Sequence, residues 1–80
     1  MKKLYLRTSD VAKVLGISRR TAENMMIMFE RYGWTIRLRP DVESSARLVN
    51  VRKLAGFLVE QDGGRVEDRV REIYECIGGN

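Results

Sequence analysis

The sequence predicts a small, mainly α-helical protein with one β-hairpin and an amphipathic helix at its C-terminal end. Three observations support this. Apolar residues recur at helical spacing in residues 10–29, apolar and polar residues alternate in residues 34–39, and glycines precede a last apolar stripe. Eighty residues suffice for one small domain, and an apolar share of 44% permits a core. We expect the domain to span residues 1–60. Residues 61–80 are expected to form a glycine-containing break followed by the C-terminal amphipathic helix.

A first helix is expected over about residues 10–15, with Thr8 or Ser9 as its N-cap. Gly16 is suited to end this helix, because glycine readily adopts a positive φ. A capping hydroxyl at Thr8, beside the positive end of the helix, is also placed to bind a phosphate. Lys13 is expected to face outward as a second contact to a DNA backbone. Residues 2–7, before this helix, are expected to form a short strand or an extended arm.

A second helix is expected after Ser18, whose hydroxyl can accept a hydrogen bond from the first turn. One face of its helical wheel is apolar and is expected in the core: Ala22, Met25, Met26 and Phe29. The opposite face carries Arg20, Asn24 and Arg31, with Glu23, Ile27 and Met28 beside it. Two helices joined in this way form a helix–turn–helix pattern, in which the second helix enters the DNA major groove.

The outward face of the second helix carries side chains suited to DNA. Arginine pairs with guanine and asparagine with adenine, so Arg20 and Asn24 are expected to read bases. Arg19 and Thr21 are better placed for phosphates. The predicted DNA-binding set of this helix is Ser18, Arg19, Arg20, Thr21, Glu23 and Asn24. The alternative is a charged face that is merely solvated.

Residues 25–29 are five apolar residues in a row, so one helix face does not hold them all. Ile27 and Met28 therefore have to be covered by the following hairpin, by the C-terminal helix or by another chain.

Gly33 is expected to end the second helix, and residues 34–39 then alternate as a half-buried strand. The inward side is predicted to hold Trp34, Ile36 and Leu38, and the outward side Thr35, Arg37 and Arg39. Residues 40–45 predict a turn-rich loop, and residues 47–49 predict the returning strand. A basic hairpin beside a recognition helix can reach the adjacent backbone or minor groove, through Arg37, Arg39 and Arg47. Alternatively, the hairpin only covers the core and these arginines are solvated.

Asn50 is expected to cap a third helix, from Val51 to about Glu60. Its buried side is predicted to hold Val51, Leu54, Phe57 and Leu58. A last helix is expected over residues 65–77, where apolar residues at offsets 0, 4, 7, 8 and 11 form a stripe. This stripe either folds back on Ile27 and Met28 or pairs with a second copy.

The sequence over roughly residues 5–60 resembles MerR-like regulators and the excisionases of phages and transposons. The resemblance rests on Ala12 with Gly16 four residues later, and on residues 46–58, where an arginine strand leads into a capped helix. It implies a winged helix–turn–helix in which Arg19, Arg20 and Asn24 enter the major groove and Arg37, Arg39 and Arg47 line the wing. It implies an excisionase-like recombination directionality factor or a compact transcriptional regulator of a mobile element, in a bacterial nucleoid or a phage-infected cell.

Charge supports a polyanionic partner, because residues 1–53 hold 12 Lys and Arg against 5 Asp and Glu. There is no His and one Cys, so no metal site, disulfide or catalytic cysteine is expected. We expect no enzyme, cofactor, small-molecule effector, signal peptide or membrane span, and a cytoplasmic location. The expected partner is double-stranded DNA, with a possible homodimer or cooperative assembly on it. The alternative function is a protein-interaction module, an anti-repressor or adaptor with the same fold.

Overall fold

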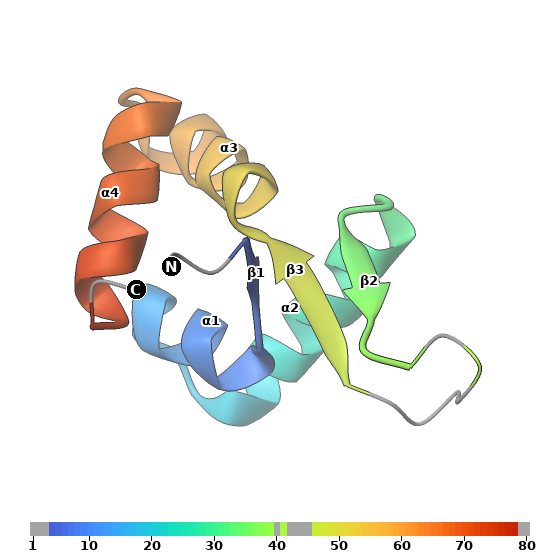
Figure 1. Cartoon of the computed structure of the whole chain (residues 1–80). Helices are drawn as coiled ribbons and strands as arrows, with labels where there is room; N and C mark the ends of the chain where they lie inside the picture. Colours follow the sequence, from blue (N-terminus) through green and yellow to red (C-terminus); the bar gives the residue numbers. More distant parts are fainter. Residues whose placement is uncertain (1–3, 40, 42–45, 79–80) are drawn as a thin grey trace.

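The computed structural model describes residues 4–39, 41 and 46–78 (Figure 1). The protein is small and mainly helical, with a three-stranded antiparallel sheet. The elements in chain order are β1 (Tyr5–Leu6), α1 (Thr8–Leu15), α2 (Arg19–Arg31), β2 (Thr35–Arg37), β3 (Arg47–Asn50), α3 (Val51–Asp62) and α4 (Val66–Cys76). The prediction of a mainly helical protein with a hairpin is therefore confirmed at this level.

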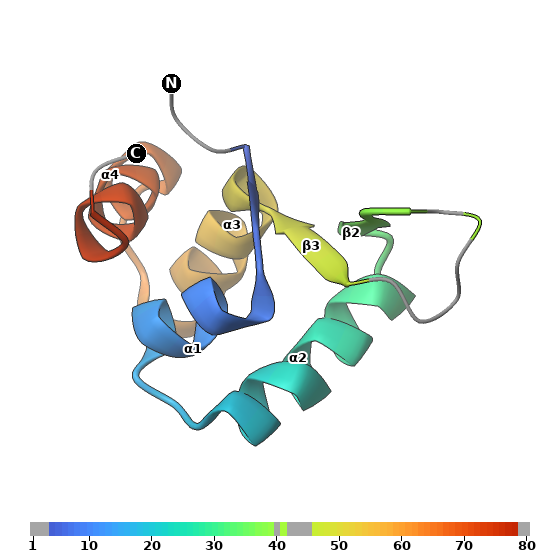
Figure 2. The same cartoon turned by 60° about the horizontal axis from the view of Figure 1, so that its bottom comes forward.

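The sheet has the order β1-β3-β2, so the short N-terminal segment adds a strand to the predicted hairpin. Leu6 lies opposite Val49 on one side of β3, and Thr35 lies opposite Val49 on the other. The predicted loop over residues 40–45 lies, apart from Asp41, outside the described residues. Figure 2 shows the C-terminal end of α2 beneath the β2–β3 hairpin.

The core combines buried side chains from every described element except β2. It consists of Leu6, Val11, Ala22, Met26, Phe29, Val49, Val51, Leu54, Ala55, Ile73 and Tyr74. The predicted apolar face of α2 is confirmed for three of its members, while Met25 is half-buried. On α3, Val51 and Leu54 are buried as predicted, and Phe57 and Leu58 are half-buried.

Phe29 joins three parts of the chain. Its ring stacks on Trp34 with centroids 5.6 Å apart, and meets Phe57 of α3 edge-on at 5.3 Å. Aromatic pairs at such separations add to the free energy gained by burial of their area. Phe29 thereby fixes where the chain leaves α2 and where the hairpin starts relative to α3.

Most predicted helix ends are confirmed. Gly16 adopts φ 65° after α1, and Gly33 adopts φ 76° after α2. The side chain of Ser18 accepts a hydrogen bond from the Thr21 N–H at 3.2 Å, and that of Asn50 accepts one from the Lys53 N–H at 3.1 Å.

The predicted start of α1 is wrong. The helix begins at Thr8 itself, with Arg7 in the N-cap position, rather than after a cap at Thr8 or Ser9. The carboxylate of Asp10 accepts a hydrogen bond from the Arg7 N–H at 3.2 Å, and this bond favours the earlier start.

The predicted inward and outward sides of β2 are reversed. Ile36 is 46% exposed and Leu38 is 60% exposed, whereas Thr35 and Arg37 are half-buried. The side chain of Trp34 precedes the strand and belongs to the aromatic cluster around Phe29, so the alternation does not continue from it. Thr35 lies opposite the buried Val49, and paired residues project from the same face of a sheet.

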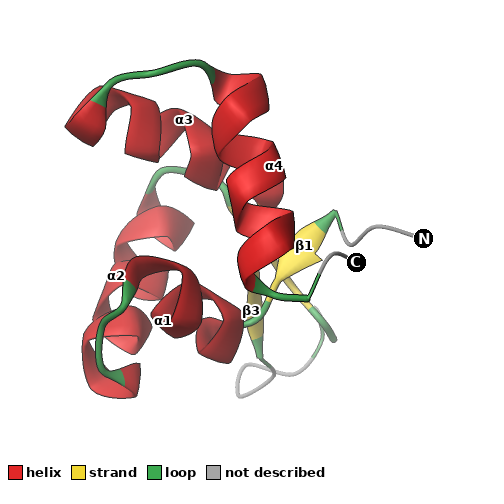
Figure 3. Ribbon diagram, turned by 90° about the vertical axis from the view of Figure 1, so that its left-hand side faces the viewer, coloured by secondary structure: helices red, strands yellow, loops and turns green. Residues whose placement is uncertain are grey.

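The helix α4 folds back on the chain, which was one of the two predicted outcomes, but it does so at a different place. It packs mainly on α3 and also contacts α1 (Figure 3). Its Ile73 and Tyr74 complete the core, so its apolar stripe is covered within the chain. It does not cover Ile27 and Met28, the two apolar residues of α2 that lie outside the predicted core face. Met28 packs against the core instead, and Ile27 remains 39% exposed.

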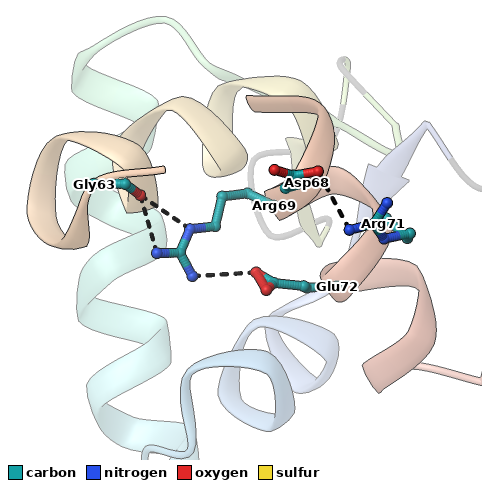
Figure 4. A network of polar contacts seen from close by, with 5 residues as sticks. All are labelled: Gly63, Asp68, Arg69, Arg71 and Glu72. Atoms are coloured by element: carbon teal, nitrogen blue, oxygen red, sulfur yellow. Dashed lines mark hydrogen bonds and ion pairs between the residues drawn. The ribbon is translucent and has the colours of Figure 1, made fainter. Parts of the chain in front are cut away.

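The α3–α4 corner is held by polar contacts. The guanidinium of Arg69 donates two hydrogen bonds to the Gly63 carbonyl, at 2.9 and 3.2 Å, and pairs with Glu72 at 3.1 Å (Figure 4). Gly63 is the C-cap of α3, where carbonyl groups lack helical partners. Arg52 in the first turn of α3 pairs with Glu67 in the first turn of α4 at 2.9 Å. This hydrogen bond from Arg52 holds the pKa of Glu67 below its ordinary value.

Replacing Arg69 with Ala is expected to lower the free energy of unfolding by about 1–2 kcal/mol, because a half-exposed charged donor to a helix-end carbonyl is lost. Arg71→Ala is the matched control on the same helix. Among the described residues, Arg71 pairs only with the exposed carboxylate of Asp68, at 3.2 Å. The expected loss of unfolding free energy is therefore under about 0.5 kcal/mol. Urea unfolding followed by circular dichroism measures both, and equal effects would contradict the assignment.

Candidate nucleic-acid interface

The outer face of α2 is open to solvent along its length. Arg20, Asn24 and Arg31 are all exposed, as the helical wheel predicts. Arg19 and Glu23 are exposed too, and form a loose ion pair at 3.6 Å. Exposed pairs of this kind contribute little to stability, so Arg19 remains available to another anion.

A hollow of about 340 Å³ lies where α1, α2 and β3 meet. Its lining comes from Thr8, Arg19, Glu23, Met26, Ile27, Ala46 and Arg47. Thr8 is the first residue of α1, so the positive end of that helix faces the hollow together with two arginines. The structure thus brings together four of the residues predicted from the sequence: Thr8, Arg19, Glu23 and Arg47.

Arg37, which was predicted on the outward side of the hairpin, instead lies with Arg47 against Glu30 of α2. The guanidinium of Arg37 lies 3.2 Å from one carboxylate oxygen of Glu30, and the Nε of Arg47 lies 3.1 Å from the other. All three side chains are half-buried. Arg37 lies opposite Arg47 in the sheet, so both project from the face that meets α2.

Sequence reasoning missed Glu30. The signal available was its position next to Phe29, because a residue beside a core position on a helix lies at the edge of the buried face. That signal becomes useful only once the hairpin is known to lie at that edge.

Lys13 and Arg39 are among the predicted residues that do not line the hollow. Lys13 is in the last turn of α1, and its carbonyl accepts a hydrogen bond from the Cys76 thiol at 3.6 Å, which puts it near the end of α4. Arg39 follows β2 and is exposed. The remaining members of the α2 set, Ser18 and Thr21, form the N-terminal cap, and their hydroxyls are 3.0 Å apart.

Comparison of the chain with the models of known families, with curated proteins and with solved structures finds no match. In the part of the chain that the structure describes, no helix is both long and apolar enough to cross a bilayer. The same residues contain no cluster of His, Cys, Asp or Glu that could hold a metal ion.

Ser18→Ala is expected to lower the free energy of unfolding by about 1 kcal/mol, because the Thr21 N–H loses its acceptor. The first turn of α2, which carries Arg19 and Arg20, should fray as a result. Urea unfolding and amide hydrogen exchange at residues 19–22 measure the two effects. Ser9→Ala is the control, since Ser9 is exposed and not a cap. Unchanged exchange in α2 would contradict the capping role.

Proposed function

We propose that this protein binds double-stranded DNA as a winged helix–turn–helix. In this proposal α1 and α2 form the helix–turn–helix, α2 enters the major groove, and the β2–β3 hairpin is the wing. The observation that carries the proposal is the hollow between α1, α2 and β3, lined by Arg19 and Arg47 and bordered by the exposed face of α2. A phosphate backbone fits such a hollow, because the N-terminus of α1 and the exposed Arg19 border it.

Each side chain then has a role that follows from its position. Arg20 and Asn24, one turn apart on the exposed face, read base edges. Arg19, Thr21 and Thr8 hold phosphates and set the register. Arg39 reaches the backbone from the wing, while Arg37 and Arg47 lie at the base of the wing beside α2. Ser18 and Glu23 are the other two members of the predicted DNA-binding set of α2.

A protein of this kind acts by occupying its site or by bending DNA. This suits an excisionase-like recombination directionality factor or a compact transcriptional regulator of a mobile element, as the resemblance of residues 5–60 implies. Either role places the protein with DNA in the cytoplasm, as a single molecule or in a cooperative assembly on the duplex.

A second candidate function, a protein-interaction module, is favoured by the outer face of the sheet. Ile36 and Leu38 are exposed there, and Leu48 and Tyr5 are half-buried beside them. Exposed apolar side chains that gather on one face are typical of protein contacts. Retention on random duplex DNA, with elution by salt, distinguishes the two candidates. Salt-dependent retention supports DNA binding, and its absence supports the second.

Arg20→Ala is expected to cost about 1–3 kcal/mol on a duplex selected by the protein from a random pool, and to relax the preference at one base pair. The physical reason is loss of a bidentate contact to a base. Fluorescence anisotropy with the selected duplex and with single-base variants measures it. A variant that keeps the full base preference would refute the role of Arg20.

Arg39→Ala is expected to weaken binding to all duplexes alike, and to reduce the slope of log K against log salt by about one. The reason is that a phosphate contact carries no sequence information. The same anisotropy titrations at several salt concentrations measure it. A loss confined to the selected duplex would mean that Arg39 reads sequence.

A further inference from the structure

Glu30 is shared by two arginines at the place where the hairpin meets α2. Its two carboxylate oxygens lie 3.2 Å from Arg37 and 3.1 Å from Arg47. The exposed fractions of the three side chains are 36% for Glu30, 23% for Arg37 and 31% for Arg47. Partial burial weakens screening by salt for this cluster, compared with the exposed pair of Arg19 and Glu23. The buried Nε of Arg47 makes no hydrogen bond among the described residues, so its contact with Glu30 is an ion pair.

A carboxylate held by two arginines presents the same kind of acceptor as a phosphate. Arginine binds either group through the same planar array of N–H donors. Arg47 also lines the hollow that the proposed function assigns to the DNA backbone. Glu30 thus pairs with Arg47, which a phosphate in that hollow would otherwise engage, and with Arg37 opposite it in the sheet.

We propose that Glu30 lowers the sequence-independent affinity for DNA by withholding Arg37 and Arg47 from DNA phosphates. This rests on the proposed function. Phosphate contacts contribute equally to every sequence, so withholding two arginines lowers affinity for random DNA. Glu30 itself touches no DNA and acts through the two arginines.

The test is Glu30→Gln, which removes the charge and keeps the shape. The variant is expected to bind random duplex DNA about 10-fold more tightly near 0.1 M salt, with a salt slope steeper by about one to two. Affinity for the selected duplex is expected to rise no more than that for random DNA, so the ratio of the two does not increase. Glu75→Gln is the matched control, because it makes the same charge change at an exposed residue of α4. It is expected to leave the salt slope unchanged.

A triple variant tests whether the two arginines carry the gain. Adding Arg37→Gln and Arg47→Gln to Glu30→Gln is expected to return the salt slope to that of the wild type. A folded Glu30→Gln protein with an unchanged or shallower slope overturns the proposal, because Glu30 would then only position the hairpin. If Glu30→Gln does not fold, Glu30→Asp takes its place. The shorter carboxylate should loosen the contact and steepen the slope, and an unchanged slope overturns the proposal.

Failure of the proposed function gives a different result. In that case the wild type shows no salt-dependent binding to any duplex, whatever Glu30→Gln does. Wild-type binding with no effect of Glu30→Gln contradicts only the role of Glu30.

Discussion

Burial of Phe29 is the constraint on which the rest of the structure depends. Its ring is fully buried and contacts Trp34 at one side and Phe57 at the other, so it fixes α2, the start of the hairpin and α3 relative to one another. The next residue, Glu30, is rotated by about 100° around the helix and therefore lies at the edge of the buried face. There it meets the hairpin and is only partly exposed to solvent. The packing of Phe29 thus determines both how α2, the hairpin and α3 are arranged and where the carboxylate of Glu30 lies.

The hairpin illustrates how a pairing register distributes charge. Val49 is buried and lies opposite Thr35, so Arg37 and Arg47 face α2, while Ile36 and Leu38 face outward. A shift of the pattern by one residue would exchange these faces. The observed register leaves positive charge concentrated next to α2, partly neutralised by Glu30, and leaves an apolar surface on the far side of the sheet.

The position of α4 also affects how charged side chains are distributed over the protein. Because α4 covers α3 and α1 and completes the core with Ile73 and Tyr74, it lies away from the outer face of α2. Its exposed acidic side chains are thereby kept apart from the arginines of α2 and the hairpin. The contact of Arg69 with the end of α3 fixes the corner that makes this arrangement possible.

The sequence by itself determined the helices, most of their caps and the exposed face of α2, because these depend on contacts between residues a few positions apart. Gly16, Ser18 and Asn50 signalled their helix ends correctly, and the spacing of Ala22, Met26 and Phe29 gave the buried face. Only the tertiary structure decided the faces of β2, the burial site of α4 and the partner of Arg37 and Arg47. A three-residue strand carries too little periodicity to fix its phase, and a helix stripe does not specify which neighbour covers it. Glu30 could be recognised only after packing around Phe29 had brought α2 and the hairpin together.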